Sequence, residues 1–306
     1  MAIKQVRVKV NNAWHTLTYN ESTGVYEGTL SAPNITSYNV NSGHYYPVTV
    51  EATNMAGTVT TIDDNTPSLG ASLKLYVKET TAPTITITAP TANQYLGTAT
   101  PEISFTITDE TNGSGVAINT LKIVVDGTTY TNTSSGVVAT AITNGYSVKF
   151  TPSTALKDGA HTVKVTVADN DGNSATSSTI SFTTDTTAPT LAVTNPSTDG
   201  SYVSEAGLTV TGTTSDSTSG VPTITIKLNG TDQGSVAVSN GSFSKPITLA
   251  SGTNTIVVTA TDKAGRTTTI TRTIILDTSA PVIASVVIDP NPVNVGASYK
   301  VTVTVE

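Results

Sequence analysis

The chain has 306 residues, with 15 Lys and Arg against 22 Asp and Glu, which gives a formal net charge of −7. It contains no Cys, and this excludes a disulfide-stapled scaffold, a Cys-ligated zinc site, an iron–sulfur cluster and thiol catalysis. A nucleic-acid-binding domain is usually basic, so the acidic balance argues against a nucleic-acid partner.

Residues 1–10 alternate apolar and polar side chains, which predicts a β-strand rather than a signal peptide. We therefore expect a protein made in the cytoplasm without an export signal. Thr, Ser, Asn or Gly interrupts every run of Val and Ile, so no segment reaches the roughly 18 apolar residues of a membrane helix. No membrane insertion is expected.

A turn motif, Asp or Asn followed three residues later by Gly, recurs between alternating strands and ends at Gly57, Gly172 and Gly265. A second marker, Thr-Ala-Pro or Ser-Ala-Pro, follows each motif and ends at Pro83, Pro189 and Pro281. Proline keeps the residue before it extended, which suits a short stiff joint. The markers therefore predict four segments, at residues 1–80, 81–186, 187–279 and 280–306.

Alternating strands that run into a tight turn also align with one another, at residues 6–12, 121–127 and 224–230. No segment has the apolar stripe of an amphipathic helix, so the predicted fold class is all-β. Each complete segment should bury one sandwich core. The central core positions are expected to include Phe105, Ile107, Val163, Val165 and Val167 in residues 81–186, and Ile256, Val258 and Ala260 in residues 187–279.

The motifs at residues 185–189, 252–265, 277–281 and 290–296 resemble those of bacterial Ig-like repeat domains. Such repeats occur in bacterial adhesins and in phage and prophage tail modules. The resemblance implies tandem Ig-like β-sandwich domains arranged as an elongated rod. It offers no catalytic residues to transfer, because the shared motifs are turns and linkers.

The three His residues, at positions 15, 44 and 161, are scattered and have no nucleophile motif beside them. His161 aligns with Asn254 at the start of a strand, which favours a structural role at a loop end. The expected protein is therefore not an enzyme and has no catalytic residues or organic cofactor.

Acidic residues gather at the predicted domain ends, where carboxylates of one domain could meet those of the next. Carboxylate and carbonyl oxygens are the ligands that Ca²⁺ prefers. The candidate calcium ligands at the domain joints are Asp109, Asp169, Asp171, Asp185, Asp216 and Asp277. The alternative is that Asp is simply a good turn residue.

The first segment is rich in aromatic residues. We expect Trp14 and Tyr19 to fill a core, because one face of an alternating strand must be buried. Tyr45 and Tyr46 are neighbours on one strand and must point to opposite faces, so one of them is expected to be exposed and available for binding.

Aligned on the common strand at residues 6–12, the first segment lacks the early strands of the other two, whereas residues 282–305 predict a strand pair without the rest of a module. The tail is therefore predicted to complete a sandwich in another subunit, either a second copy or another virion protein. The interface candidates are Tyr45, Tyr46, Ile283, Val287, Tyr299, Val301 and Val303. In the alternative, insertions at residues 35–43 and 62–70 close the first segment and the tail is a disordered end.

The predicted function is a non-enzymatic structural or adhesion component of a phage or phage-like particle, such as a tail fibre, a tail-associated protein or a decoration protein. The expected location is the virion, with other virion proteins, further copies and a host cell-surface glycan as candidate partners. One alternative is a fragment of a secreted cell-surface adhesin. Another is a polysaccharide-binding accessory module.

Overall fold

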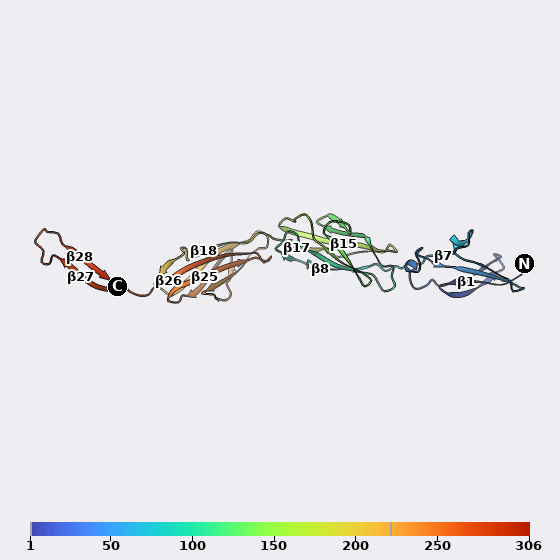
Figure 1. Ribbon diagram of the computed structural model, residues 1–306, viewed down its shortest axis with the longest axis horizontal. Coiled ribbons are helices and arrows are strands. Elements are labelled where there is room, and N and C mark those ends of the chain that lie inside the picture. Colours follow the sequence, from blue (N-terminus) through green and yellow to red (C-terminus); the bar gives the residue numbers. More distant parts are fainter. Residues whose placement is uncertain (1, 221) are drawn as a thin grey trace. The chain divides into compact units, whose positions relative to one another are not determined.

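The computed structural model describes residues 2–220 and 222–306, which form strands and turns together with two short 3-10 helices, η1 (Ser37–Asn39) and η2 (Gly70–Leu73) (Figure 1). The predicted all-β fold of tandem sandwiches is confirmed. Two compact units, residues 1–185 and 186–306, are described separately below. Among the described residues, no helix has the length and apolar character needed to cross a membrane.

The first module (residues 2–77) is built on one antiparallel sheet. Its strand order is β3 (Val25–Glu27), β2 (Ala13–Asn20), β1 (Ile3–Val10), β5 (Thr49–Asn54) and β6 (Val59–Ile62). Two further strands, β4 (Tyr46–Pro47) and β7 (Lys74–Leu75), pair beside it. Asn11 and Asn12 both have positive φ, which is the conformation that a tight two-residue hairpin between β1 and β2 requires.

Trp14 does not fill the core of this module, contrary to expectation. The register pairs Trp14 with Lys9, on the face of the sheet opposite to that of Val8. There the Arg7 guanidinium lies 4.2 Å from the centre of the indole ring, which remains 38% exposed. Tyr19 is also exposed and packs against Tyr26. Alternation alone could not decide which face of the strand would be covered.

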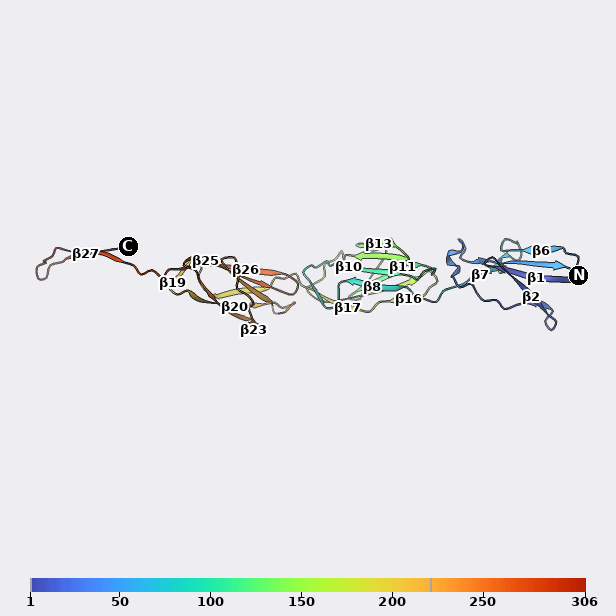
Figure 2. The same ribbon diagram turned by 90° about the horizontal axis from the view of Figure 1, so that it is seen from below.

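The second module (residues 84–184) is a sandwich of two sheets, seen from two sides in Figures 1 and 2. One sheet has the order β13 (Val137–Ile142), β14 (Gly145–Phe150), β10 (Ile103–Thr108) and β8 (Thr84–Ala89). The other has the order β12 (Thr128–Thr131), β11 (Val116–Val125), β15 (Gly159–Asp169), β17 (Ile180–Thr184) and β9 (Gln94–Leu96), with β16 (Ser174–Thr176) also paired to β15. The predicted core residues Phe105, Ile107, Val163, Val165 and Val167 are at most 1% exposed.

The third module (residues 190–276) repeats this arrangement. One sheet has the order β18 (Thr190–Asn195), β20 (Gly207–Ser215), β24 (Ser242–Thr248) and β23 (Val238–Ser239). The other has the order β19 (Ser201–Val203), β26 (Thr267–Leu276), β25 (Gly252–Thr261), β21 (Thr223–Leu228) and β22 (Thr231–Asp232). Ile256, Val258 and Ala260 are fully buried, as predicted.

The C-terminal hairpin consists of β27 (Ile283–Asp289) and β28 (Lys300–Val305) (Figure 1, red). Every residue from 277 to 306 is exposed. These strands therefore lack the packing that stabilises the equivalent elements of the sandwiches. An isolated two-stranded hairpin is only marginally stable in water.

His161 has a structural role at the start of β15. Its Nδ1 lies 2.6 Å from the Asp126 carboxylate, and its Nε2 lies 2.8 Å from the Lys157 carbonyl. In the third module Asn254 occupies the matching position, where its side chain hydrogen-bonds Asn229 and the backbone of Ala250. Both side chains join the start of a strand to a neighbouring loop.

The Asp126 contacts predict a pH dependence of stability. Burial alone raises the pKa of Asp126, but the hydrogen bonds from His161 and the Thr162 backbone outweigh burial and lower this pKa overall. The folded pKa therefore lies below the unfolded value of about 3.9, so the stabilisation is complete above that value and is lost as the pH falls through the folded pKa. Urea unfolding of Asp126→Asn should show a lower midpoint than wild type at pH 7 and a smaller gap below about pH 4. A gap that is constant across this range would contradict the assignment.

Candidate metal centre

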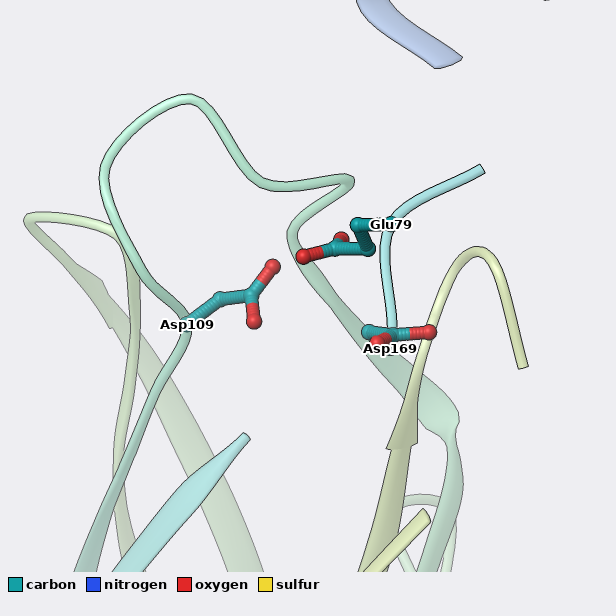
Figure 3. A group of neighbouring side chains, drawn as sticks. All are labelled: Glu79, Asp109 and Asp169. Carbon is teal, nitrogen blue, oxygen red and sulfur yellow. The ribbon is translucent and has the colours of Figure 1, made fainter. Parts of the chain in front are cut away.

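Three carboxylates meet at the end of the second module that lies next to the first (Figure 3). Glu79, Asp109 and Asp169 each offer an oxygen, and these oxygens all lie within 4.8 Å of one another. Asp109 and Asp169 are buried, at 6% and 2% exposure. Such a group of buried negative charges is unfavourable unless something compensates it.

The strand topology brings the three side chains together. Asp109 directly follows β10 of one sheet, and Asp169 is the last residue of β15 in the other. Glu79 lies in the joint between the first and second modules, residues 78–83, which leads into β8. The centre therefore spans both sheets of the second module and the chain that leads into it.

Loop hydrogen bonds orient the carboxylates. Asp169 accepts hydrogen bonds from the backbone N–H groups of Gly172 at 2.6 Å and Asn173 at 2.8 Å. Asp109 Oδ2 accepts one from the Gly115 N–H at 2.7 Å, and Glu79 Oε1 accepts one from the Ser114 N–H. Each side chain is thus held in place by backbone of the surrounding loops.

Two oxygens in this group are buried and have no hydrogen-bond partner, Asp109 Oδ1 and Glu79 Oε2. Figure 3 shows the Asp109 and Glu79 carboxylates pointing toward each other. A buried acceptor without a partner costs free energy comparable to that of a lost hydrogen bond, and more when it is charged. A cation between the carboxylates would satisfy both oxygens.

The pKa values of Asp109 and Glu79 are both raised in this centre. Burial raises the pKa of Asp109, and the neighbouring negative charges of Glu79 and Asp169 raise it further, against the Gly115 hydrogen bond. Burial also raises the pKa of Glu79, as does a contact with Glu110. The site therefore favours binding a positive charge, whether a proton or a metal ion.

The donor set fits a hard cation. Ca²⁺ takes six to eight oxygen ligands from carboxylates, carbonyls and water. The three carboxylates supply part of such a shell, and Glu110 lies close enough to contribute to the pKa shifts of Glu79 and Asp109. A pocket of about 400 Å³, lined in part by Lys78, Glu79 and Glu110, opens beside the centre and gives it access to solvent.

The predicted calcium ligands have different surroundings in the structure. Asp109 and Asp169 come together in the centre. Asp171 instead accepts hydrogen bonds from the Thr36 hydroxyl of the first module and from the Glu79 backbone N–H of the joint. Asp216 accepts hydrogen bonds from the N–H groups of Thr218 and Ser219, and exposed Asp277 accepts one from the Ser279 N–H. The Asp185 side chain is fully buried, and its backbone N–H bonds the Leu96 carbonyl.

Glu79 was not among the predicted ligands, although a sequence signal points to it. Glu79 lies four residues before Pro83, as Asp185 lies four residues before Pro189 and Asp277 four before Pro281. In this one copy Glu takes the position that Asp occupies in the other two.

Of the predicted aromatic contact residues, Tyr46 is buried and donates its hydroxyl hydrogen to the Ile35 carbonyl. Tyr45 is half-buried, bonded to Asp64 and packed against Tyr76. The two neighbouring rings thus differ in burial, as expected, and a binding role for the half-exposed Tyr45 stays a prediction.

The hairpin candidates are exposed, but not all on one face. Val301 and Val303 lie opposite Ile288 and Val286 on one face. Val287 lies opposite Thr302 on the other face, which separates it from the predicted interface. Ile283 and Tyr299 are also exposed, at 64% and 56%.

Comparison with known families agrees with the strand topology. Residues 90–186 match the family described as a bacterial Ig-like domain, and residues 189–278 match domain B of glucodextranase. The chain is an Ig-like repeat protein. The predicted resemblance is thereby confirmed for the second and third modules.

Individual relatives match this chain to different extents. Bacillopeptidase F from Bacillus subtilis (strain 168) is 34% identical over 132 residues, which is 43% of this chain and 9% of the length of that protein. Fibronectin(III)-like modules of Clostridium thermocellum CbhA are 19% identical, with a TM-score of 0.41 over 63% of this chain and 94% of that chain. A 1.5-MDa bacterial ice-binding adhesin is 21% identical, with a TM-score of 0.32 over 90% and 88% of the two chains.

Ig-like domains are typical of adhesins and surface proteins, and their folds are generally non-catalytic. Their function therefore depends on what the loops and joints carry rather than on the fold itself.

Proposed function

We propose that this chain is a non-enzymatic structural and adhesion component in which Ig-like modules act as a spacer. The observation that carries the proposal is the joint between the first and second modules. A spacer must hold one module in a defined orientation to the next. At this joint, hydrogen bonds connect the first module and the joint to the second module.

Side chains of the first module and of the joint donate hydrogen bonds to the second module. Asn39 donates to the Gly113 carbonyl at 3.0 Å, and Thr36 donates to the Asp171 carboxylate. Lys78 donates to the Asp171 carbonyl at 3.2 Å. These contacts link η1 and the joint itself to the loops of the second module.

A bound Ca²⁺ would add to this joint, and we include it in the proposal. Glu79 belongs to the joint, whereas Asp109 and Asp169 belong to the second module. An ion shared by the three would anchor the joint to both sheets of that module. The unpartnered, buried Asp109 oxygen supports this role.

We further propose that the chain belongs to a phage or phage-like particle, as a tail fibre, tail-associated or decoration protein. Immunogold labelling with an antibody against the chain tests it, applied to purified particles and to washed cells of the producing culture. Label on the particles is expected. Label confined to the cell envelope would instead favour the adhesin alternative, and glycan-array binding without either label would favour the polysaccharide-binding alternative.

The spacer proposal predicts an elongated particle in solution. A compact protein of this length has a radius of gyration of roughly 19 Å, whereas modules set end to end, each with strands about 33 Å long, give a clearly larger value. Small-angle scattering of the 306-residue chain measures it. A radius of gyration near the compact value would rule out the spacer.

A further inference from the structure

The C-terminal hairpin has one apolar face and one polar face. The register of β27 and β28 pairs Val286 with Val303 and Ile288 with Val301, so these four side chains share a face. Ser285, Thr302 and Thr304 lie on the other face, with Val287 as the one apolar residue among them. All four residues of the apolar face are roughly half exposed, at 43% to 56%.

The second module shows what such a strand pair does when it is covered. There β8 and β10 follow Pro83 as β27 and β28 follow Pro281. Phe105 and Ile107 of β10 are 1% and 0% exposed, because they pack in the core shared with β11 and β15. The apolar face of the hairpin has no such facing sheet among the described residues, since every residue of both strands is exposed.

The first module presents a sheet face with the opposite deficiency. Val6 and Val10 of β1 are half-buried, whereas Leu121 and Val125, at the matching positions of β11, are buried. Tyr46 and Leu73 are buried in this module, so part of its interior is already covered by its own chain. A pocket of about 410 Å³ remains, and its apolar lining includes Val10, Ala13, Leu30, Pro33, Val48 and Leu75.

We propose that the apolar face of β27–β28 in one copy of the chain docks into this pocket on the first module of a second copy. The hairpin would take the place over β1 and β5 that β8 and β10 take over β11 and β15. Two sheets that pack face to face in this way bury the apolar side chains of both inner faces. The proposal is independent of the spacer function, which a monomer could also fulfil.

The expected contact is of modest size. Together with Ile283 and Val305, the apolar residues of the hairpin present on the order of 500 Å² of apolar surface, so both partners would bury roughly 1,000 Å². This lies at the low end of specific protein interfaces. We therefore expect assembly that depends on protein concentration rather than a permanent dimer. Because one copy offers both a hairpin and a pocket, assembly can continue beyond two copies.

Sedimentation equilibrium of the full chain tests the proposal. The average mass of wild type should rise above 31.4 kDa with increasing concentration. Val303→Asp places a charge on the apolar face and should raise the concentration needed for assembly at least tenfold. Thr302→Asp, one residue away on the polar face, is the matched control and should leave assembly unchanged. Both changes lie in an exposed hairpin, so unaltered circular dichroism should verify that the modules remain folded.

Disulfide trapping identifies the docking surface, and the cysteine-free chain makes it unambiguous. A Leu30→Cys copy mixed with a Val303→Cys copy should form a mixed dimer on oxidation, whereas Thr302→Cys in place of Val303→Cys should not. A monomeric wild type at all concentrations, equal assembly of the two Asp variants, or equal trapping by both hairpin positions would overturn the proposal.

Discussion

Replacing Val165 by Asp is expected to unfold the second module. Val165 lies on β15 with 0% exposure, among Phe105, Ile123 and the other core residues of the sandwich. An unpaired charge in an apolar core costs several kcal/mol, and a folded domain has only about 5–15 kcal/mol of stability in total. Hydrogen exchange should therefore show amides of β11 and β15 exchanging at the rates of an unfolded chain.

Val138→Asp is the matched control for this substitution. Val138 lies on β13, at the edge of the other sheet, and is 60% exposed. The same chemical change there should leave protection of β15 within the range of wild type. The third module serves as an internal reference, because amides around Val258 should remain protected in both variants. Protected β15 amides in Val165→Asp would show that this core tolerates a charge.

Calcium is expected to stabilise the first unit by a measurable amount. At a free concentration one hundred times the dissociation constant, a single site adds about 2.7 kcal/mol, which for a unit of this size raises Tm by roughly 5 to 10 °C. Differential scanning calorimetry of the full chain with Ca²⁺, and then with excess chelator, measures this shift. A chelator that changes neither Tm nor the scattering profile would show that calcium does not stabilise the joint.

Asp109→Asn separates a metal ligand from a residue that only bonds a loop. The amide oxygen can still accept the hydrogen bond from the Gly115 N–H. The variant should lose most of the calcium-dependent shift, because one charged ligand is gone. Without calcium it should be at least as stable as wild type, because a buried charge next to Glu79 and Asp169 has been removed. Asp277→Asn, at an exposed position outside the centre, should behave like wild type in both conditions.

Local patterns were sufficient to predict the strands and the cores. Alternation with period two assigns Val163, Val165 and Val167 to one face, and in a sandwich that face is the core. The Asp-x-x-Gly turns were found because a tight turn needs Gly at positive φ, as Gly172 and Gly265 have. These features depend on residues a few positions apart, so they can be seen without the fold.

Which face of a strand is covered was decided only by the tertiary structure. Trp14 and Val287 lie on well-predicted strands, yet each points away from its expected neighbours. In the first module one sheet carries most of the strands, so its two faces are covered unequally. In the hairpin, an irregularity between Ile283 and Ser285 shifts the register, and a shift of one residue exchanges the faces.

The candidate metal centre depended on both levels. Asp109 and Asp169 could be chosen from the sequence, because each lies where a strand ends, at one end of a repeat. Glu79 joined them, and Asp171 turned toward Thr36 instead, because the path of the chain through the joint sets which oxygens converge. A sequence pattern places residues at the end of a sandwich, but distances between separate loops and the joint follow only from how the two sheets pack together.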